Sequence, residues 1–175
     1  METYILKMRF EPHAWSGNLV MLDYDGVLTS RTDGGFWQLD PEKYSMSEKM
    51  FARLVDFLGR TDSKVVISSN WRKFDDGGFW IHRSGRYYNP LPDLRRRLGA
   101  HLFGDLGRDR HVPKVEALRR YVEKNGPRNF VVFDDDPGEG FQDSEFRDRF
   151  VMTDNSFGLT ESDCAKAELI LAGGA

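Results

Sequence analysis

The feature that most constrains this chain is a short apolar run that ends in two carboxylates. Residues 19–22 are all large and apolar, and they lead directly into Asp23, Tyr24, Asp25 and Gly26. An uninterrupted apolar run of this length that stops at a turn signal is typical of a buried strand. Because an unpaired carboxylate in an apolar environment is costly, Asp23 and Asp25 must face a cation, hydrogen-bond donors or a solvated cleft.

Three interpretations of these carboxylates can be compared. Mg²⁺ prefers hard oxygen ligands and commonly takes one or two carboxylates beside a substrate phosphate. The pair Asp25-Gly26 is also typical of a solvated turn after a strand, and on the dipeptide alone this alternative stays open. A calcium-binding loop is excluded, because its twelfth position must be Glu and here it is Gly34.

Length and composition favour one domain over residues 1–175. Of the 175 residues, 39% are hydrophobic and 13% aromatic, which is enough for a substantial core. We expect a cytoplasmic protein with no membrane partner, because no apolar run has transmembrane length and the first residues do not resemble a signal peptide. The single Cys164 forbids an intrachain disulfide and is expected to be a small buried residue on a helix.

Hydrophobic periodicity predicts alternating strands and helices. We expect strands at 19–24, 64–68, 129–133 and 150–152, with an added edge strand at 3–10. This alternation predicts an α/β fold, with a mostly parallel sheet and helices on both of its faces. In such sheets the ligand lies beyond the carboxyl ends of the strands.

Helix boundaries are marked by their own signals. Ser45-x-x-Glu48 predicts a capping box before the first helix, and Thr160-x-x-Asp163 another before a last helix that ends near residue 171. A short helix is expected at 93–98. Pro113 suits the start of a further helix, and Asn125-Gly126-Pro127 suits its end.

Polar residues follow each of the first three predicted strands. The first is followed by Asp23-x-Asp25, and Lys114 opens the helix before the third strand. The second strand is followed by Ser68, Ser69, Asn70, Trp71 and Arg72, and the third by Asp134, Asp135 and Asp136. Each signal alone has an ordinary alternative: a helix cap, a charged loop or a surface lysine. In this order, they predict one site at the edge of the sheet.

This combination resembles the haloacid dehalogenase (HAD) superfamily of phosphoryl-transfer hydrolases over residues 19–136. Three details resemble the HAD branch found in nucleic-acid (RNA) repair proteins: residues 67–72, the triple Asp run and residues 153–160. The resemblance implies a HAD-like Rossmannoid three-layer sandwich. It also implies a small cap or none, because the insertions at about 29–64 and 71–113 are too short to bury a core of their own.

The resemblance also implies roles for individual residues. Asp23 would attack phosphorus and form an aspartyl-phosphate, and Asp25 would act as general acid and then as general base. Ser68 would donate a hydrogen bond to the phosphoryl group, with Ser69 as the alternative hydroxyl, and Lys114 would neutralise charge. The implied Mg²⁺ ligands are Asp23, the backbone carbonyl of Asp25, and Asp135, with Asp134 as a further ligand or a residue behind them.

The substrate is expected to be phosphorylated, and a basic segment favours a polyanion. Residues 81–124 hold 11 Lys or Arg against 5 Asp or Glu, although the whole chain has a net charge of −3. The densest part is Arg95–Arg97, for which a solvated helix face is the alternative. Trp71 and the aromatic residues after it either stack on bases or pack the insertion on the core. Asn70 and Arg72 are further candidates for substrate binding.

These observations predict a Mg²⁺-dependent phosphatase, a phosphoric monoester hydrolase that acts on a nucleotide or a nucleic-acid end. A small-metabolite phosphatase and a non-catalytic HAD-like binding or regulatory module are the alternatives. A dinucleotide-binding protein is disfavoured, because no G-x-G-x-x-G follows the first strand.

Overall fold

A parallel sheet forms the centre of the protein. The computed structural model describes residues 17–33, 45–74, 79–82 and 85–173. Every pair of neighbours in the five-stranded sheet is parallel. In spatial order its strands are β5 (Leu102–Asp105), β2 (Ser63–Ile67), β1 (Asn18–Leu22), β6 (Asn129–Asp134) and β7 (Phe150–Met152). The predicted sheet is therefore confirmed, and the proposed strand at 3–10 lies outside the described residues.

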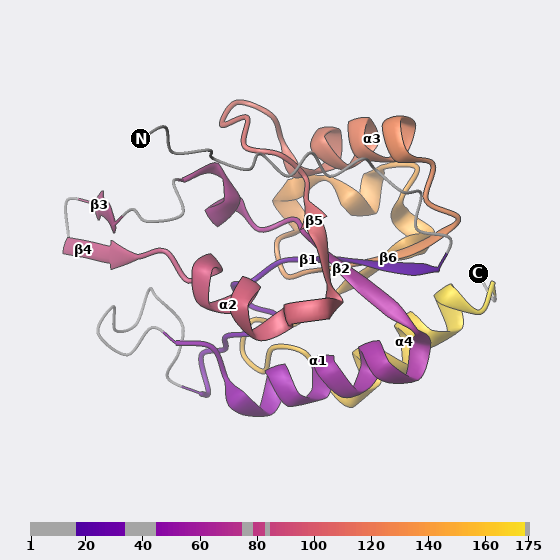
Figure 1. Ribbon diagram of the computed structural model, residues 1–175, viewed down its shortest axis with the longest axis horizontal. Coiled ribbons are helices and arrows are strands. Elements are labelled where there is room, and N and C mark those ends of the chain that lie inside the picture. The colour runs from indigo at the N-terminus through magenta and orange to yellow at the C-terminus, as the bar shows by residue number, and fades with distance from the viewer. Residues whose placement is uncertain (1–16, 34–44, 75–78, 83–84, 174–175) are drawn as a thin grey trace, which may run out of the picture.

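Helices cover both faces of this sheet (Figure 1). They are α1 (Glu48–Thr61), α2 (Leu91–Leu98), α3 (Lys114–Asn125) and α4 (Glu161–Leu171). Val20 and Leu22 of β1 face the cluster that holds α1, α2 and α4, whereas Leu19 and Met21 face α3. This is the alternation of a strand buried on both faces. The result is the expected three-layer sandwich, and no described helix could span a membrane.

The strand register aligns the carboxyl ends of β1, β2 and β6, and therefore the polar residues found there. Leu22 pairs with Ile67 of β2 on one side and with Phe133 of β6 on the other. The next residues are tied to the same frame, because Ser68 N–H donates to Leu22 O at 2.8 Å and Asp23 N–H donates to Phe133 O at 3.0 Å. Three neighbouring strands therefore deliver their polar residues to the same edge of the sheet.

The second expected insertion is smaller than predicted. Residues 71–113 contain β5, which is an edge strand of the central sheet, and α2, whose Leu91, Leu94 and Leu98 join the main core. Only the hairpin of β3 (Phe79–His82) and β4 (Gly85–Tyr88) forms a separate antiparallel sheet. Much of this segment therefore belongs to the body of the fold.

The helix boundaries confirm most of the sequence signals and correct one. The cap of α1 is Ser47, which accepts from Met50 N–H at 3.4 Å, so the predicted capping box at Ser45 is wrong. Thr160 and Asp163 form the expected capping box of α4, where Cys164 is buried. Gly126, with φ of 53°, ends α3 as expected.

Candidate active site

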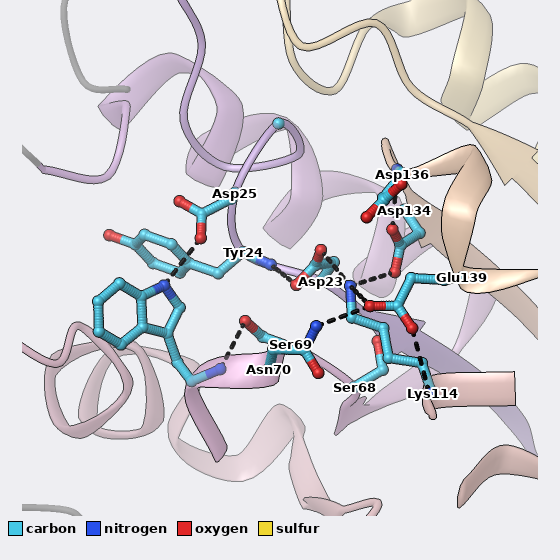
Figure 2. A network of polar contacts seen from close by, with 12 residues as sticks. Asp23, Tyr24, Asp25, Ser68, Ser69, Asn70, Lys114, Asp134, Asp136 and Glu139 are labelled. Atoms are coloured by element: carbon cyan, nitrogen blue, oxygen red, sulfur yellow. Dashed lines mark hydrogen bonds and ion pairs between the residues drawn. The ribbon is translucent and has the colours of Figure 1, made fainter. Parts of the chain in front are cut away.

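A buried ion pair lies at the centre of the site. Lys114 opens α3 and is 2% exposed, and its Nζ lies 2.7 Å from Asp23 Oδ2 and 2.7 Å from Asp134 Oδ2. The second oxygen of Asp23 accepts from Tyr24 N–H at 2.8 Å. Figure 2 shows these side chains pointing toward one another from three different elements. Three of the residues singled out by the sequence therefore meet in one cluster.

Electrostatics favour a further cation beside this pair. Burial alone would lower the pKa of Lys114, but Asp23 and Asp134 raise it above its usual range, so the ammonium stays charged. Burial and then Asp23 raise the pKa of Asp134 to about 8, against the pull of Lys114. The raised pKa of Asp134 reflects the repulsion between two buried carboxylates that share one ammonium, and a metal ion beside them would relieve that repulsion when both are ionised.

The carboxylates are grouped as a hard cation requires. Asp23, Asp134 and Asp135 each offer an oxygen, and these atoms lie within 4.8 Å of one another. Burial and then Asp23 raise the pKa of Asp135 to about 6, while a hydrogen bond from Asn155 opposes that shift. The donor set fits Mg²⁺, and both oxygens of Asp134 already accept, from Lys114 and from Asp136 N–H at 3.0 Å.

Gly26 is required by the approach of Asp135. Its φ is +64°, a conformation that side chains disfavour, and a Cβ at this position would overlap the carboxyl group of Asp135. Thr153 fixes the same turn by donating from Oγ1 to Gly26 O at 2.8 Å. The glycine therefore allows the loop after β1 to lie in contact with the loop after β6.

Asp25 is held apart from the carboxylate cluster. Its Oδ2 accepts from Trp71 Nε1–H at 2.8 Å, and the indole is 8% exposed. Figure 2 shows the two carboxyl groups of Asp23 and Asp25 directed to different sides of the loop. The two carboxylates therefore have different surroundings, as two different roles in acid–base chemistry would require. Of the two roles considered for Trp71, the structure shows packing on the core: the residue is buried and donates to Asp25.

Ser68 and Ser69 differ in what they contact. The Oγ of Ser68 is buried and has no hydrogen-bond partner in the described part of the chain. Ser69 instead caps the short 3₁₀ turn Asn70–Lys73, since its Oγ accepts from Trp71 N–H at 3.4 Å. A buried hydroxyl without a partner is costly, so Ser68 is the one that a ligand oxygen would satisfy.

Arg72 is buried and hydrogen-bonds to the backbone of the loop after β2. It is 1% exposed, and its Nη1 donates to the carbonyls of Ser68 at 2.6 Å and Ser69 at 3.1 Å. The structure therefore places this guanidinium against the backbone of the loop that carries Ser68.

Glu139 is a member of the site that the sequence did not reveal. Its Oε1 accepts from Asn70 Nδ2 at 2.7 Å, and its Oε2 accepts from Lys114 N–H at 3.2 Å (Figure 2). Glu139 lies three residues beyond the predicted acidic run, in a short 3₁₀ turn of Pro137–Glu139 that follows β6. It connects the loop after β2 to the start of α3.

The segment 153–159 closes the other side of the site. Leu159 N–H donates to Val27 O at 2.8 Å, and Arg31 N–H donates to Asn155 O at 2.9 Å. Asn155 also hydrogen-bonds to Asp135, as described above. Sequence reasoning noted this segment only as a resemblance and missed Asn155, because an Asn in a loop carries no distinctive signal.

The Arg95–Arg97 run does not form a free basic surface. Arg95 pairs with Asp105 at 3.0 Å, and Arg96 pairs with Asp93. Arg97 donates to both oxygens of Glu48 at 2.6 Å and lies over the ring of Phe51. Arg95 and Arg97 join α2 to β5 and α1, and Arg96 pairs within α2, so the positive charge of the run is largely balanced within the fold.

Comparison with known protein families agrees with this geometry. Residues 19–164 match the family model described as the HAD domain in Swiss Army Knife RNA repair proteins. No curated protein and no solved structure matched the chain. The match spans all three strand ends, Lys114 and the segment 153–159. The chain belongs to this family of HAD domains and is a hydrolase of the HAD superfamily.

Proposed function

We propose that this protein is a Mg²⁺-dependent phosphatase that works through an aspartyl-phosphate on Asp23 and acts on a nucleotide or a nucleic-acid end. One observation carries the proposal: the buried Lys114 bridges Asp23 and Asp134 at 2.7 Å each, beside the Ser68 hydroxyl, which has no hydrogen-bond partner among the described residues. A nucleophilic carboxylate, a cation for the phosphoryl charge and a hydroxyl donor are thereby brought to one edge of the sheet.

In the first step, an oxygen of Asp23 attacks the phosphorus atom and the ester bond to the leaving oxygen breaks. Asp25, protonated at that stage, gives its proton to the leaving oxygen. Lys114 and the Ser68 hydroxyl stabilise the charge on the phosphoryl oxygens while Lys114 keeps the nucleophile in place. The products of this step are the free alcohol and the aspartyl-phosphate.

In the second step, Asp25 is ionised and takes a proton from water. The water oxygen attacks phosphorus, and the bond to Asp23 breaks, which releases inorganic phosphate and restores both carboxyl groups. The Nε1–H of Trp71 donates to Asp25 Oδ2 at 2.8 Å. This hydrogen bond keeps the Asp25 carboxyl group directed away from Asp23. Separate positions allow the two carboxyl groups to perform different tasks.

Asp23 and Asp135, with the backbone carbonyl of Asp25, would hold the metal ion, and Asp134 would support them from behind. This assignment follows the HAD resemblance and the grouping of the three carboxylates, and the hydrogen bonds from Lys114 and from Asp136 N–H hold Asp134 in place. When bound, Mg²⁺ would lessen the repulsion between the Asp23 carboxylate and the phosphate dianion.

The family match supports nucleic acid as the source of the phosphate. Small metabolites remain the second candidate, because nothing in the catalytic cluster itself distinguishes a nucleic-acid phosphate from another phosphate monoester. A screen of nucleotides, phosphorylated oligonucleotides and sugar phosphates separates the two.

The test is phosphate release from an aryl phosphate, with and without Mg²⁺, by the wild type, Asp23→Asn and the control Asp148→Asn. Asp148 lies on the surface, with its side chain 75% exposed. We expect activity that needs Mg²⁺, is lost in Asp23→Asn and is kept in Asp148→Asn. Equal activity of wild type and Asp23→Asn would refute the proposal.

A further inference from the structure

A hollow of about 350 Å³ lies between α3 and the segment that follows β5, and the buried Arg72 reaches its wall. Figure 1 shows that segment and α3 on the same side of the sheet. The wall of this hollow combines residues of α3, such as Tyr121 and Lys124, with residues 105–109 and with the buried Arg72. We call it the α3 pocket. It is distinct from the carboxylate cluster, but it shares Arg72 with the loop that carries Ser68.

The lining of the α3 pocket is positively charged. Two of its residues are acidic: Asp105 pairs with Arg95 at 3.0 Å, and Asp109 accepts from the backbone N–H of His111 at 3.0 Å and keeps its charge. The positive charges come from four side chains, Arg72, Arg108, Arg120 and Lys124. An anion is therefore the ligand class that this lining favours.

Arg72 supplies a donor that the described part of the protein does not satisfy. Its Nη1 is used by the carbonyls of Ser68 and Ser69, whereas its Nε is buried and without a partner. Arginine keeps its charge in proteins, so burial cannot be relieved by losing the proton. The guanidinium therefore brings a fixed positive charge to this wall of the pocket, which favours an anion.

The pocket also has an apolar part. Tyr121 is half-buried along its wall, next to Leu106, Val112 and Ala117. A bare phosphate ion would leave this surface without contacts, whereas a base or ribose would cover it. The cavity size also falls in the range of small-molecule sites. The combination fits a nucleotide unit better than a simple anion.

We propose that the α3 pocket binds a nucleotide unit of a single-stranded nucleic-acid substrate, next to the unit whose phosphate reaches Asp23. This inference rests on the proposed function and names its substrate class. Arg72 links the two places physically, since one guanidinium both lines the pocket and holds the backbone of Ser68 at 2.6 Å. Arg120 is exposed in its ion pair with Glu116, and Glu116 keeps Arg119 as a second partner, so a phosphate can replace Glu116 at Arg120 at little cost.

The test measures binding of a short fluorescent single-stranded oligoribonucleotide by anisotropy over a range of KCl concentrations, with no Mg²⁺ present. The variant is Arg120→Ala/Lys124→Ala, and the control Arg128→Ala/Arg147→Ala removes two exposed cations outside the pocket. We expect about tenfold weaker binding by the variant, with a salt slope lower by about 2, and wild-type binding by the control.

Equal binding by the variant and the wild type, or equal weakening in both double variants, would overturn the proposal. Circular dichroism and thermal melts of each variant show whether the fold is kept, and Tyr121→Leu provides an independent variant without a change of charge. Because binding is measured without turnover, its failure is distinguishable from failure of the phosphatase assay. Phosphate release with normal Asp23 dependence but no pocket effect would remove only this inference.

Discussion

The indole Nε1–H of Trp71 donates a hydrogen bond of 2.8 Å to Oδ2 of Asp25, across 46 residues of sequence. This contact ties the loop after β2 to the loop after β1. It also holds the second carboxylate of the Asp-x-Asp motif apart from the first. The geometry makes Trp71 a positioning residue for the proposed acid and base.

Replacing Trp71 by Phe keeps an apolar ring but removes the donor. We expect kcat for an aryl phosphate to fall about tenfold, since one hydrogen bond to a charged group is lost. The pH profile should also shift, because the surroundings of Asp25 change. Unchanged kcat and an unchanged profile in a folded Trp71→Phe variant would show that the contact has no part in catalysis.

Lys114→Met should remove activity and destabilise the apo protein. The change leaves Asp23 and Asp134 buried without their cation, which costs about 3–5 kcal/mol in the free energy of unfolding. Urea titrations measure this loss, with Lys166→Met as the control because the Lys166 side chain is 62% exposed. Equal stability of the two variants would contradict the account.

Gly26→Ala should abolish Mg²⁺ binding, because its Cβ would overlap the carboxyl group of Asp135. The matched control is Gly126→Ala, where φ is also positive at +53° in the left-handed region but nothing lies within 4 Å of the added Cβ. Backbone strain is thus common to both variants, at about 1 kcal/mol. Calorimetric titration with Mg²⁺ separates them, and normal Mg²⁺ binding by Gly26→Ala would contradict the proposed site.

Glu139→Gln should lower kcat about tenfold without preventing folding. The substitution keeps the size of the side chain but replaces one of the two oxygens that accept from Asn70 and Lys114 N–H. The control is Glu123→Gln, an exposed position on α3. Phosphate release by both variants provides the comparison, and identical rates would remove Glu139 from the site.

Mg²⁺ affinity should fall as the pH is lowered from 8 to 5. Burial and Asp23 raise the pKa of Asp135 to about 6, so in the metal-free protein this carboxyl group becomes protonated below that pH. A proton must then leave before the metal binds. Titration calorimetry in two buffers of different ionisation enthalpy measures the protons released, and a pH-independent affinity would contradict a metal site at Asp135.

The central part of the site was predictable because each residue follows an apolar run. Asp23 and Ser68 directly follow β1 and β2, Asp134 is the last residue of β6, and parallel strands bring such positions to one edge. The role of Glu139 was not predictable, since an acidic residue in a glycine-rich loop looks like any solvated one. Asn155 was missed for the same reason.

Other differences have similarly local causes. The strand β5 was missed because it has four residues, includes Gly104 and is only partly buried. Ser45 and Ser47 both satisfy the sequence rule for a cap, and only the path of the chain decides between them. The run Arg95–Arg97 suggested a basic surface. Two of its partners, Asp105 in β5 and Glu48 in α1, lie outside α2, so the sequence of the helix does not reveal them. Charge balance of this kind depends on tertiary contacts.

The measurement that tests the central claim most directly is detection of phosphate on Asp23. Asp25→Asn should allow attack on an aryl phosphate, whose leaving group needs little protonation, and should slow hydrolysis of the intermediate. Acid quenching during turnover, followed by mass spectrometry of peptides, should then find phosphorylated Asp23. Mg²⁺-dependent phosphate release with no phosphorylated Asp23 in either the wild type or Asp25→Asn would contradict the aspartyl-phosphate mechanism.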